Sequence, residues 1–268
     1  MAADRVYTPG LASAAQLAAV HRRLGMSRWV VVQPSPYGTD NRCTLDAVRA
    51  GNAGGADAAR AVVVLDETDG PSELRAMHAA GARGARVNLE TSGLHDPVQA
   101  RAALENAARR VAPLGWHVQI YTNLRMVEQM ADTIGRLPVA VVLDHFAGLR
   151  GEAGLNQPGL AVVLDLLAAG NLYVKLSAAQ RASNAPDCAD LRPLVRMLVE
   201  RRNDRLLWGT DWPHPGAWPK VKRDPAVVEP FHPIDDERAL ARLAEWVPEQ
   251  NRFERIVSTN PALLYGWS

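Results

Sequence analysis

Short apolar runs alternate with longer amphipathic stretches along almost the whole of this 268-residue chain. The apolar runs are rich in valine, and each is short enough to be a buried strand. They are WVVVQPS (29–35), AVVVLD (61–66), ARVNL (85–89), WHVQIYT (116–122), VAVVLDH (139–145), LYVKLS (172–177) and LLWGTD (206–211). Because helical patterns separate these strands, we predict an α/β protein with a parallel sheet.

The residues that end the predicted strands decide between two parallel architectures. A doubly wound open sheet and a (β/α)8 TIM barrel both fit the alternation. In a barrel the carboxyl ends of all strands meet at one mouth, whereas an open sheet needs polar ends mainly at its switch point. The polar strand ends are Gln33, Ser35, Asp66, Asn88, Gln119, Tyr121, His145, Ser177 and Asp211. We therefore predict a TIM barrel, with residues 1–268 as a single domain.

Composition and simple motifs argue against several classes of function. The net charge of +1 gives no electrostatic support for binding nucleic acid or an anionic membrane. No apolar run has the roughly 18 residues of a membrane helix, and the N-terminus lacks the apolar core of a signal peptide. Cys43 and Cys188 provide no disulfide framework, and no glycine-rich phosphate motif is present. We expect a cytoplasmic protein.

Period-two alternation predicts which strand residues share a face. It places His145 with Val141 and Leu143, and leaves Asp144 on the opposite face. The remaining groups are His117 with Gln119 and Tyr121, Tyr173 with Lys175 and Ser177, and Leu207 with Gly209 and Asp211. Because a barrel interior needs polar groups only near its mouth, these polar residues are candidates for a site.

Each candidate also has a structural interpretation. A strand-end acid such as Asp211 is more often a helix cap or a loop anchor than a catalyst, and Asp144 is better interpreted as tying down the next loop. His117 is equally well explained as a core histidine. Lys175 can pair with a carboxylate and do nothing else, and the strand-end serines can bond to the backbone. The convergence of complementary polar groups on one mouth favours a site.

The stretch LLWGTDWPHP (206–215) resembles the final-strand signature of the amidohydrolase-related (amidohydrolase family 2) TIM-barrel hydrolases, in the branch of 2-pyrone-4,6-dicarboxylate lactonases. The supporting stretches follow the family order along nearly the whole chain. They are VVQPSPYGTDN (31–41), GARGARVNL (81–89), APLGWHVQIY (112–121), VVLDHFAG (141–148), LYVKLSAAQR (172–181) and NPALLYGW (260–267).

The resemblance implies that Asp211 is a general base that activates water against an ester or lactone carbonyl. Opening a lactone also needs a group that polarises the carbonyl, for which His145 and His117 are candidates. Arg86 and Arg181 suit forked contacts with substrate carboxylates. The other predicted substrate-binding residues are Ser35, Tyr37, Asn88, Tyr121, Lys175, Ser177 and His214.

One departure from the family pattern concerns the first strand, which carries a His-x-His pair in most relatives. This chain begins with DRVYTPGLA (4–12), which resembles the segment just after that strand, so the first strand is apparently missing. The remaining set, His145 and Asp211 with at most His117, is a poor zinc site. We therefore expect no metal or other cofactor, and a seam between the strands at 29–35 and 206–211.

The sequence predicts a metal-independent hydrolase of carboxylated lactones, in the catabolism of aromatic or sugar acids. A small carboxylated molecule is the expected partner, and a homodimer is possible. One alternative is a metal-dependent decarboxylase of the same superfamily. Another is a non-catalytic barrel that binds a carboxylated small molecule.

Overall fold

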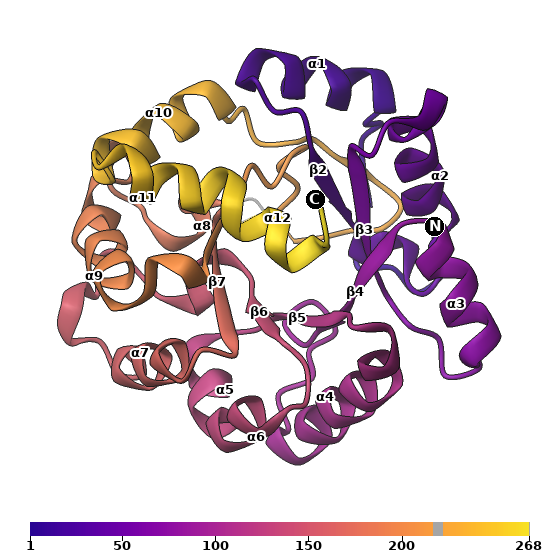
Figure 1. The fold of residues 1–268 in the computed structure, drawn as a ribbon, viewed down its shortest axis with the longest axis horizontal. Coiled ribbons are helices and arrows are strands. Elements are labelled where there is room, and N and C mark those ends of the chain that lie inside the picture. The colour runs from indigo at the N-terminus through magenta and orange to yellow at the C-terminus, as the bar shows by residue number, and fades with distance from the viewer. Residues whose placement is uncertain (217–221, 268) are drawn as a thin grey trace. The chain divides into compact units, whose positions relative to one another are not determined.

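The computed structural model describes residues 1–216 and 222–267, and it divides the chain into two compact units. The first unit comprises Met1–Arg86 and Thr210–Leu240, and the second comprises Val87–Gly209 and Ala241–Ser268. In both units, strands and helices alternate along the chain (Figure 1). In the main sheet, β2 pairs with β3, β3 with β4, β5 with β6, β6 with β7 and β7 with β8, all in parallel. The predicted α/β class is therefore confirmed.

Within the first unit, strands of the main sheet follow the order β2-β3-β4, with Trp29 opposite Ala59 and Ala61 opposite Ala82. A separate two-residue parallel ladder joins β1 to β9, and the sequence did not predict it. The elements are β1 (Thr8–Pro9), α1 (Ala14–Leu24), β2 (Trp29–Val32), η1 (Ser35–Tyr37), α2 (Arg42–Gly51), η2 (Ala53–Gly55), β3 (Ala59–Val63), α3 (Pro71–Ala79), most of β4 (Ala82–Asn88), β9 (Val228–Glu229) and the start of α10 (Asp236–Trp246).

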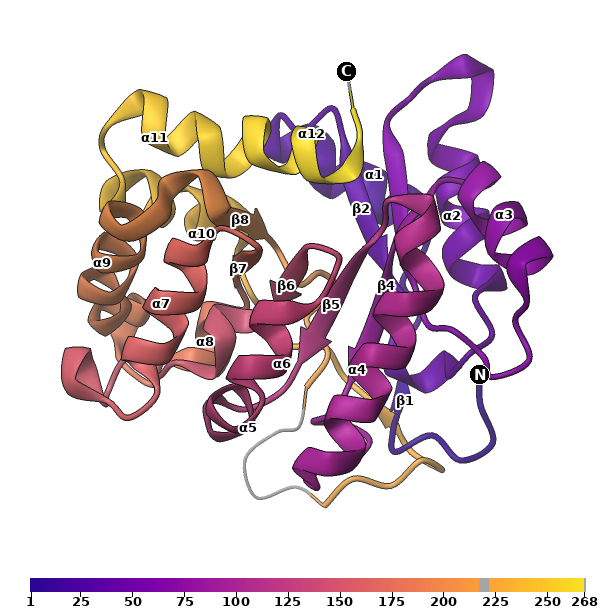
Figure 2. The same cartoon turned by 60° about the horizontal axis from the view of Figure 1, so that its bottom comes forward.

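The second unit contains four parallel strands in the order β5-β6-β7-β8, and helices α4, α7 and α9 pack against them (Figure 2). Its elements are α4 (Pro97–Val111), η3 (Ala112–Leu114), β5 (His117–Tyr121), α5 (Leu124–Gln129), α6 (Ala131–Arg136), β6 (Val141–Leu143), η4 (His145–Gly148), η5 (Gly154–Asn156), α7 (Leu160–Ala169), β7 (Leu172–Ser177), α8 (Ala179–Ala182), η6 (Pro186–Leu191), α9 (Arg192–Arg202), η7 (Asn203–Arg205), β8 (Leu206–Gly209), α11 (Gln250–Glu254), the π-helical turn η8 (Arg255–Thr259) and α12 (Asn260–Tyr265).

Each of the seven predicted strands has a counterpart, but several end earlier than predicted. The strand predicted at 139–145 is Val141–Leu143, and the one at 206–211 is Leu206–Gly209. In both cases the extended conformation stops shortly before a left-handed residue, His145 with φ 49° and Asp211 with φ 68°. The polar residues at these strand ends therefore stand on turns rather than in the strands.

Capping residues explain the bounds of α1. Ser13 forms a capping box with Gln16, and Gly25 ends the helix in the left-handed conformation with φ 67°. α4 and α5 begin in the same way, because the side chains of Asp96 and Asn123 accept backbone N–H groups of their first turns.

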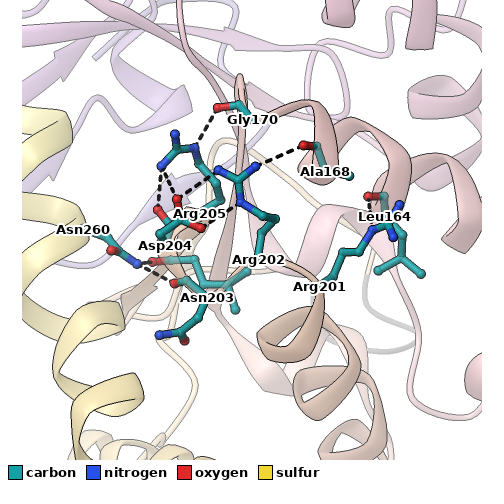
Figure 3. A network of polar contacts seen from close by, with 10 residues as sticks. Leu164, Ala168, Gly170, Arg201, Arg202, Asn203, Asp204, Arg205 and Asn260 are labelled. Carbon is teal, nitrogen blue, oxygen red and sulfur yellow. Dashed lines mark hydrogen bonds and ion pairs between the residues drawn. The ribbon is translucent and has the colours of Figure 1, made fainter.

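A polar network fixes the segment that leads into β8 (Figure 3). Arg202 and Arg205 both bind the carboxylate of Asp204, and their guanidinium groups also donate to the carbonyls of Ala168 and Gly170. These carbonyls lie at the carboxyl end of α7, where cations are favoured. Asn260 of α12 donates to two further carbonyls, those of Asn203 and Leu206, both at 2.8 Å. The start of β8 is thus held by α7 and α12.

Within residues 1–216 and 222–267, none of the helices has the length and apolarity needed to cross a lipid bilayer. The missing first strand, the seam between 29–35 and 206–211 and the single-domain organisation stay predictions.

Candidate active site

Asp144 is the hub of a buried polar cluster in the second unit. It follows β6 directly and is 2% exposed. Its carboxylate accepts hydrogen bonds from Gln119 Nε2 at 2.9 and 3.0 Å and from Lys175 Nζ at 3.1 Å. The cluster therefore connects β5, the end of β6 and β7. Lys175 is paired with a carboxylate, as its structural interpretation anticipates.

His145 reaches the same part of the second unit through a turn. Strict alternation predicts opposite faces for His145 and Asp144, but His145, Phe146 and Ala147 all adopt positive φ, at 49°, 58° and 58°. This turn brings His145 Nδ1 to 2.9 Å from Ser177 Oγ. Asp144 is still extended, and it lies two residues after Val142, which is opposite Gln119 and Tyr173, so alternation places it on the face of Gln119 and Lys175. The left-handed turn changes the position of His145, which alternation alone would keep away from Ser177.

The surroundings of His145 have the features of a functional site. The ring of Tyr121 meets the His145 ring edge-on, with 4.9 Å between ring centroids. Three consecutive non-glycine residues in the left-handed region are costly, and such strain concentrates at functional sites. Gly209 lies opposite Ser177, and a Cβ there would be 3.3 Å from Lys175 Cε. The glycine therefore avoids a close contact beside Lys175.

His117 occupies the amino end of β5, four residues before Tyr121, or about 13 Å along the strand. It is buried, and its ring packs edge-on against Tyr265 of α12 with 5.2 Å between centroids. Burial, followed by the charge of Asp144, raises the pKa of Tyr265. This position favours the interpretation of His117 as a core histidine.

In the first unit, Asp211 stands at the head of a tight turn. Its carbonyl accepts a hydrogen bond from His214 N at 2.7 Å, and the Thr210 hydroxyl accepts one from Trp212 N at 3.0 Å. The residue is partly exposed. A partly exposed carboxylate on a strained turn is suited to contact with water and substrate.

His214 is buried rather than exposed to a ligand. Its Nε2 lies 3.3 Å from Oδ2 of Asp236, the first residue of α10.

His21 of α1 stacks on Trp29, with 4.5 Å between ring centroids. Burial lowers the pKa of His21 from 6.5 to about 4, although the charge of Asp236 acts in the opposite direction.

We expect the stability of the protein to fall as the pH decreases from about 6.5 to 4. In this window the unfolded chain protonates His21 and the folded chain does not, so the unfolded state binds more protons. Because the side chain keeps some exposure, we expect His21 to contribute about 1–2 kcal/mol to the loss between pH 7 and pH 5. Chemical denaturation at both pH values measures this loss. The His21→Phe variant, which keeps a ring on Trp29, should lose less, and an unchanged loss would contradict the assignment.

Three other candidates of the first unit lie near the ends of β2 and β4. Arg86 donates from Nη1 to the carbonyl of Gln33 at 3.1 Å. Ser35 and Tyr37 belong to η1, which follows β2. Burial, followed by the charge and hydrogen bond of Cys43, raises the pKa of Tyr37. Tyr37 therefore stays protonated as a hydrogen-bond donor at neutral pH.

The remaining candidates of the second unit are Asn88 and Arg181. The Asn88 side chain accepts a hydrogen bond from Thr91 N at 3.0 Å, which closes the turn after β4. Arg181 lies in α8, just after β7, and its carbonyl accepts a hydrogen bond from Arg150.

The described side chains do not group together as metal ligands do. Among residues 1–216 and 222–267, no three or more His, Cys, Asp or Glu side chains are grouped so that they could hold a metal ion. The candidate residues as placed therefore do not fit a metal centre.

Comparison with known proteins gives consistent matches over the whole chain. The family model described as Amidohydrolase matches residues 1–267. A 2-pyrone-4,6-dicarboxylate hydrolase from Comamonas testosteroni is 36% identical over 98% of this chain and 84% of that protein. A 4-sulfomuconolactone hydrolase from Hydrogenophaga intermedia is 31% identical over 98% of this chain and 82% of that protein.

A solved structure extends this similarity to the fold. It is a Pseudomonas putida protein described as a candidate 2-pyrone-4,6-dicarboxylic acid hydrolase. It superimposes with a TM-score of 0.81 at 28% identity, over 99% of this chain and 92% of that protein.

Proposed function

Because this chain belongs to the amidohydrolase family, we propose that it is a hydrolase that opens a carboxylated lactone. The observation that carries the proposal is the 36% identity to a 2-pyrone-4,6-dicarboxylate hydrolase over 98% of the chain. The sulfomuconolactone hydrolase supports it, since that name also describes a cyclic ester with an acidic substituent. The substrate class is therefore a lactone with one or more acidic groups.

We assign the role of general base to Asp211. Its carboxylate takes a proton from water while the water oxygen attacks the lactone carbonyl carbon. The bond between that carbon and the ring oxygen then breaks, and the ring oxygen leaves with the proton that Asp211 took from the water. The new carboxyl group releases its remaining proton to solvent. The products are a carboxylate and a hydroxyl group, or its keto form when the hydroxyl is enolic.

We assign His145 to the carbonyl oxygen of the substrate. A hydroxyl hydrogen from Ser177 to Nδ1 would fix the neutral ring in the tautomer that carries its proton on Nε2. The Nε2–H group can then donate to the oxygen on which negative charge develops. The burial of Ser177, at 2% exposure, suits this orienting role.

We propose that Arg86 and Arg181 bind the acidic groups of the substrate, because guanidinium forks match carboxylates in geometry and charge. Ser35, Tyr37, Asn88, Tyr121 and Lys175 are the further candidates for hydrogen bonds to it. We propose a reaction without a metal, since the described side chains offer no grouping of metal ligands.

The purified protein should hydrolyse 2-pyrone-4,6-dicarboxylate at least about 100-fold more efficiently in kcat/KM than an uncharged 2-pyrone. Two charge-assisted anchors of 1.5–3 kcal/mol each account for such a ratio. Loss of pyrone absorbance measures the rate, and prior treatment with EDTA should leave it unchanged. Loss on chelation with recovery in zinc, accompanied by CO2 release, would support the decarboxylase alternative. Binding of the dicarboxylate without turnover would support the non-catalytic alternative.

A further inference from the structure

We propose that His214 and Asp236 form a buried pair that holds Asp211 in its working backbone conformation. His214 is then a positioning residue for the general base instead of the substrate ligand that its place in the motif suggests. This inference rests on the proposed role of Asp211. All the contacts that carry it lie within the first unit.

The turn that carries Asp211 needs an external support. Asp211 and His214 both have left-handed backbones, with φ 68° and 63°, a conformation that is unfavourable for residues other than glycine. Within the turn, His214 N donates to the Asp211 carbonyl at 2.7 Å. The His214 carbonyl in turn accepts a hydrogen bond from His232 N at 3.0 Å. Because His214 closes the turn through its backbone, any shift of His214 moves Asp211.

The side chain of His214 connects this turn to the start of α10. Its Nε2 lies 3.3 Å from Asp236 Oδ2, and both side chains are 5% exposed. The neighbouring acid, Asp235, has a different task, since its exposed carboxylate accepts the Arg238 N–H at 2.9 Å and caps α10. Of the two consecutive aspartates, Asp235 caps the helix and Asp236 contacts His214.

Buried polar atoms surround the contact between His214 and Asp236. His214 Nδ1, Asp236 Oδ1 and His21 Nδ1 are buried and have no hydrogen-bond partner among the described residues. His21 of α1 is the titratable neighbour on which the charge of Asp236 acts. A buried polar atom that loses its partner is costly, so His214 and Asp236 are each held by the contact with the other. With Nε2 used in this way and 4% exposure, His214 is poorly placed to bind substrate.

Asp236→Asn tests the pair with almost no change in side-chain size, and Asp235→Asn is the matched control. We expect Asp236→Asn to lower kcat for lactone hydrolysis by about 10–100-fold with KM within about threefold, because a small misplacement of a catalytic group has effects of this size. Asp235→Asn should change neither kinetic constant, even if it lowers Tm. His214→Gln combined with Asp236→Asn should cost little more than either change alone.

A second measurement does not depend on activity. Hydrogen exchange in a peptide covering residues 206–216 should be faster in Asp236→Asn than in Asp235→Asn. If both variants exchange alike, the pair does not hold the turn and the inference fails, whether or not the protein hydrolyses lactones. An inactive parent enzyme would overturn the proposed function, and faster exchange in Asp236→Asn would still support the pair. A His214→Gln variant with KM raised tenfold and unchanged kcat would identify His214 as a substrate ligand and overturn the inference.

Discussion

Replacing Asp211 with asparagine is expected to lower kcat for lactone hydrolysis by about 100-fold or more, with KM changed by no more than about threefold. The amide has the size of the carboxylate and keeps an oxygen acceptor, but it cannot take a proton from water. The substitution should also be structurally mild, because asparagine tolerates the left-handed region and Asp211 has φ 68°. A loss of rate can therefore be attributed to the missing base.

The chain provides a matched control for this experiment. Asp187 is also an aspartate in the left-handed region, with φ 52°. Its side chain forms an ion pair with Arg242 in the second unit and has no assigned role in the reaction. Asp187→Asn should keep the parental kcat. This result would show that placing asparagine at a left-handed position does not by itself lower kcat. An Asp211→Asn enzyme that turns over at the parental rate would show that another group activates the water.

The positions of the strands and the polar ends could be predicted because both depend on local sequence patterns. A valine-rich run followed by a polar residue identifies β6 and β8 without knowledge of any neighbour. The position of His145 could not be predicted in this way. Alternation places it opposite Asp144, but the left-handed turn at 145–147 follows the strand. Histidine is enriched at positive φ, but phenylalanine and alanine are not, so a run of three left-handed residues does not follow from His-Phe-Ala.

Side-chain contacts between residues that are far apart in the sequence could not be predicted either. The inward face of Lys175 follows from alternation, but its pairing with Asp144 depends on the register in which Val142 lies opposite Tyr173. The contact of His214 with Asp236 spans 22 residues and depends on the course of the intervening chain. The sequence therefore predicted which residues are polar and near a strand end, and the structure was needed to show which of them bind each other.

The ion pair between Asp144 and Lys175 leads to the prediction with the largest effect on stability. Their side chains are 2% and 16% exposed, and Gln119 also donates to the carboxylate. Lys175→Met would remove the ammonium group that compensates the buried charge of Asp144. Asp144→Asn would remove the charge that compensates Lys175. We expect each single variant to lose about 3–5 kcal/mol of unfolding free energy, because removing one partner leaves a buried charge uncompensated.

The double variant Asp144→Asn/Lys175→Met removes both charges together. It should be less destabilised than the sum of the single variants by at least about 2 kcal/mol, since no uncompensated buried charge remains. Denaturant unfolding at pH 7 measures all four proteins. Asp165→Asn, which breaks an ion pair with Arg201 whose side chains are 43% and 78% exposed, is the control, and it should cost no more than about 1 kcal/mol. Additive losses in the cycle would mean that the two charges do not depend on each other.

The same double variant separates the two interpretations of Lys175. If the lysine only compensates Asp144, the recovery of stability should be accompanied by kcat and KM within a few-fold of the parental values, measured where the variant is fully folded. If the ammonium group also binds a substrate carboxylate, KM for the dicarboxylated lactone should stay raised by about tenfold or more, as expected for one lost charge-assisted hydrogen bond. With 16% exposure of its side chain and a single 3.1 Å contact to Asp144, Lys175 has donor hydrogens to spare for a ligand. We therefore expect the second result, in which stability recovers and substrate affinity does not.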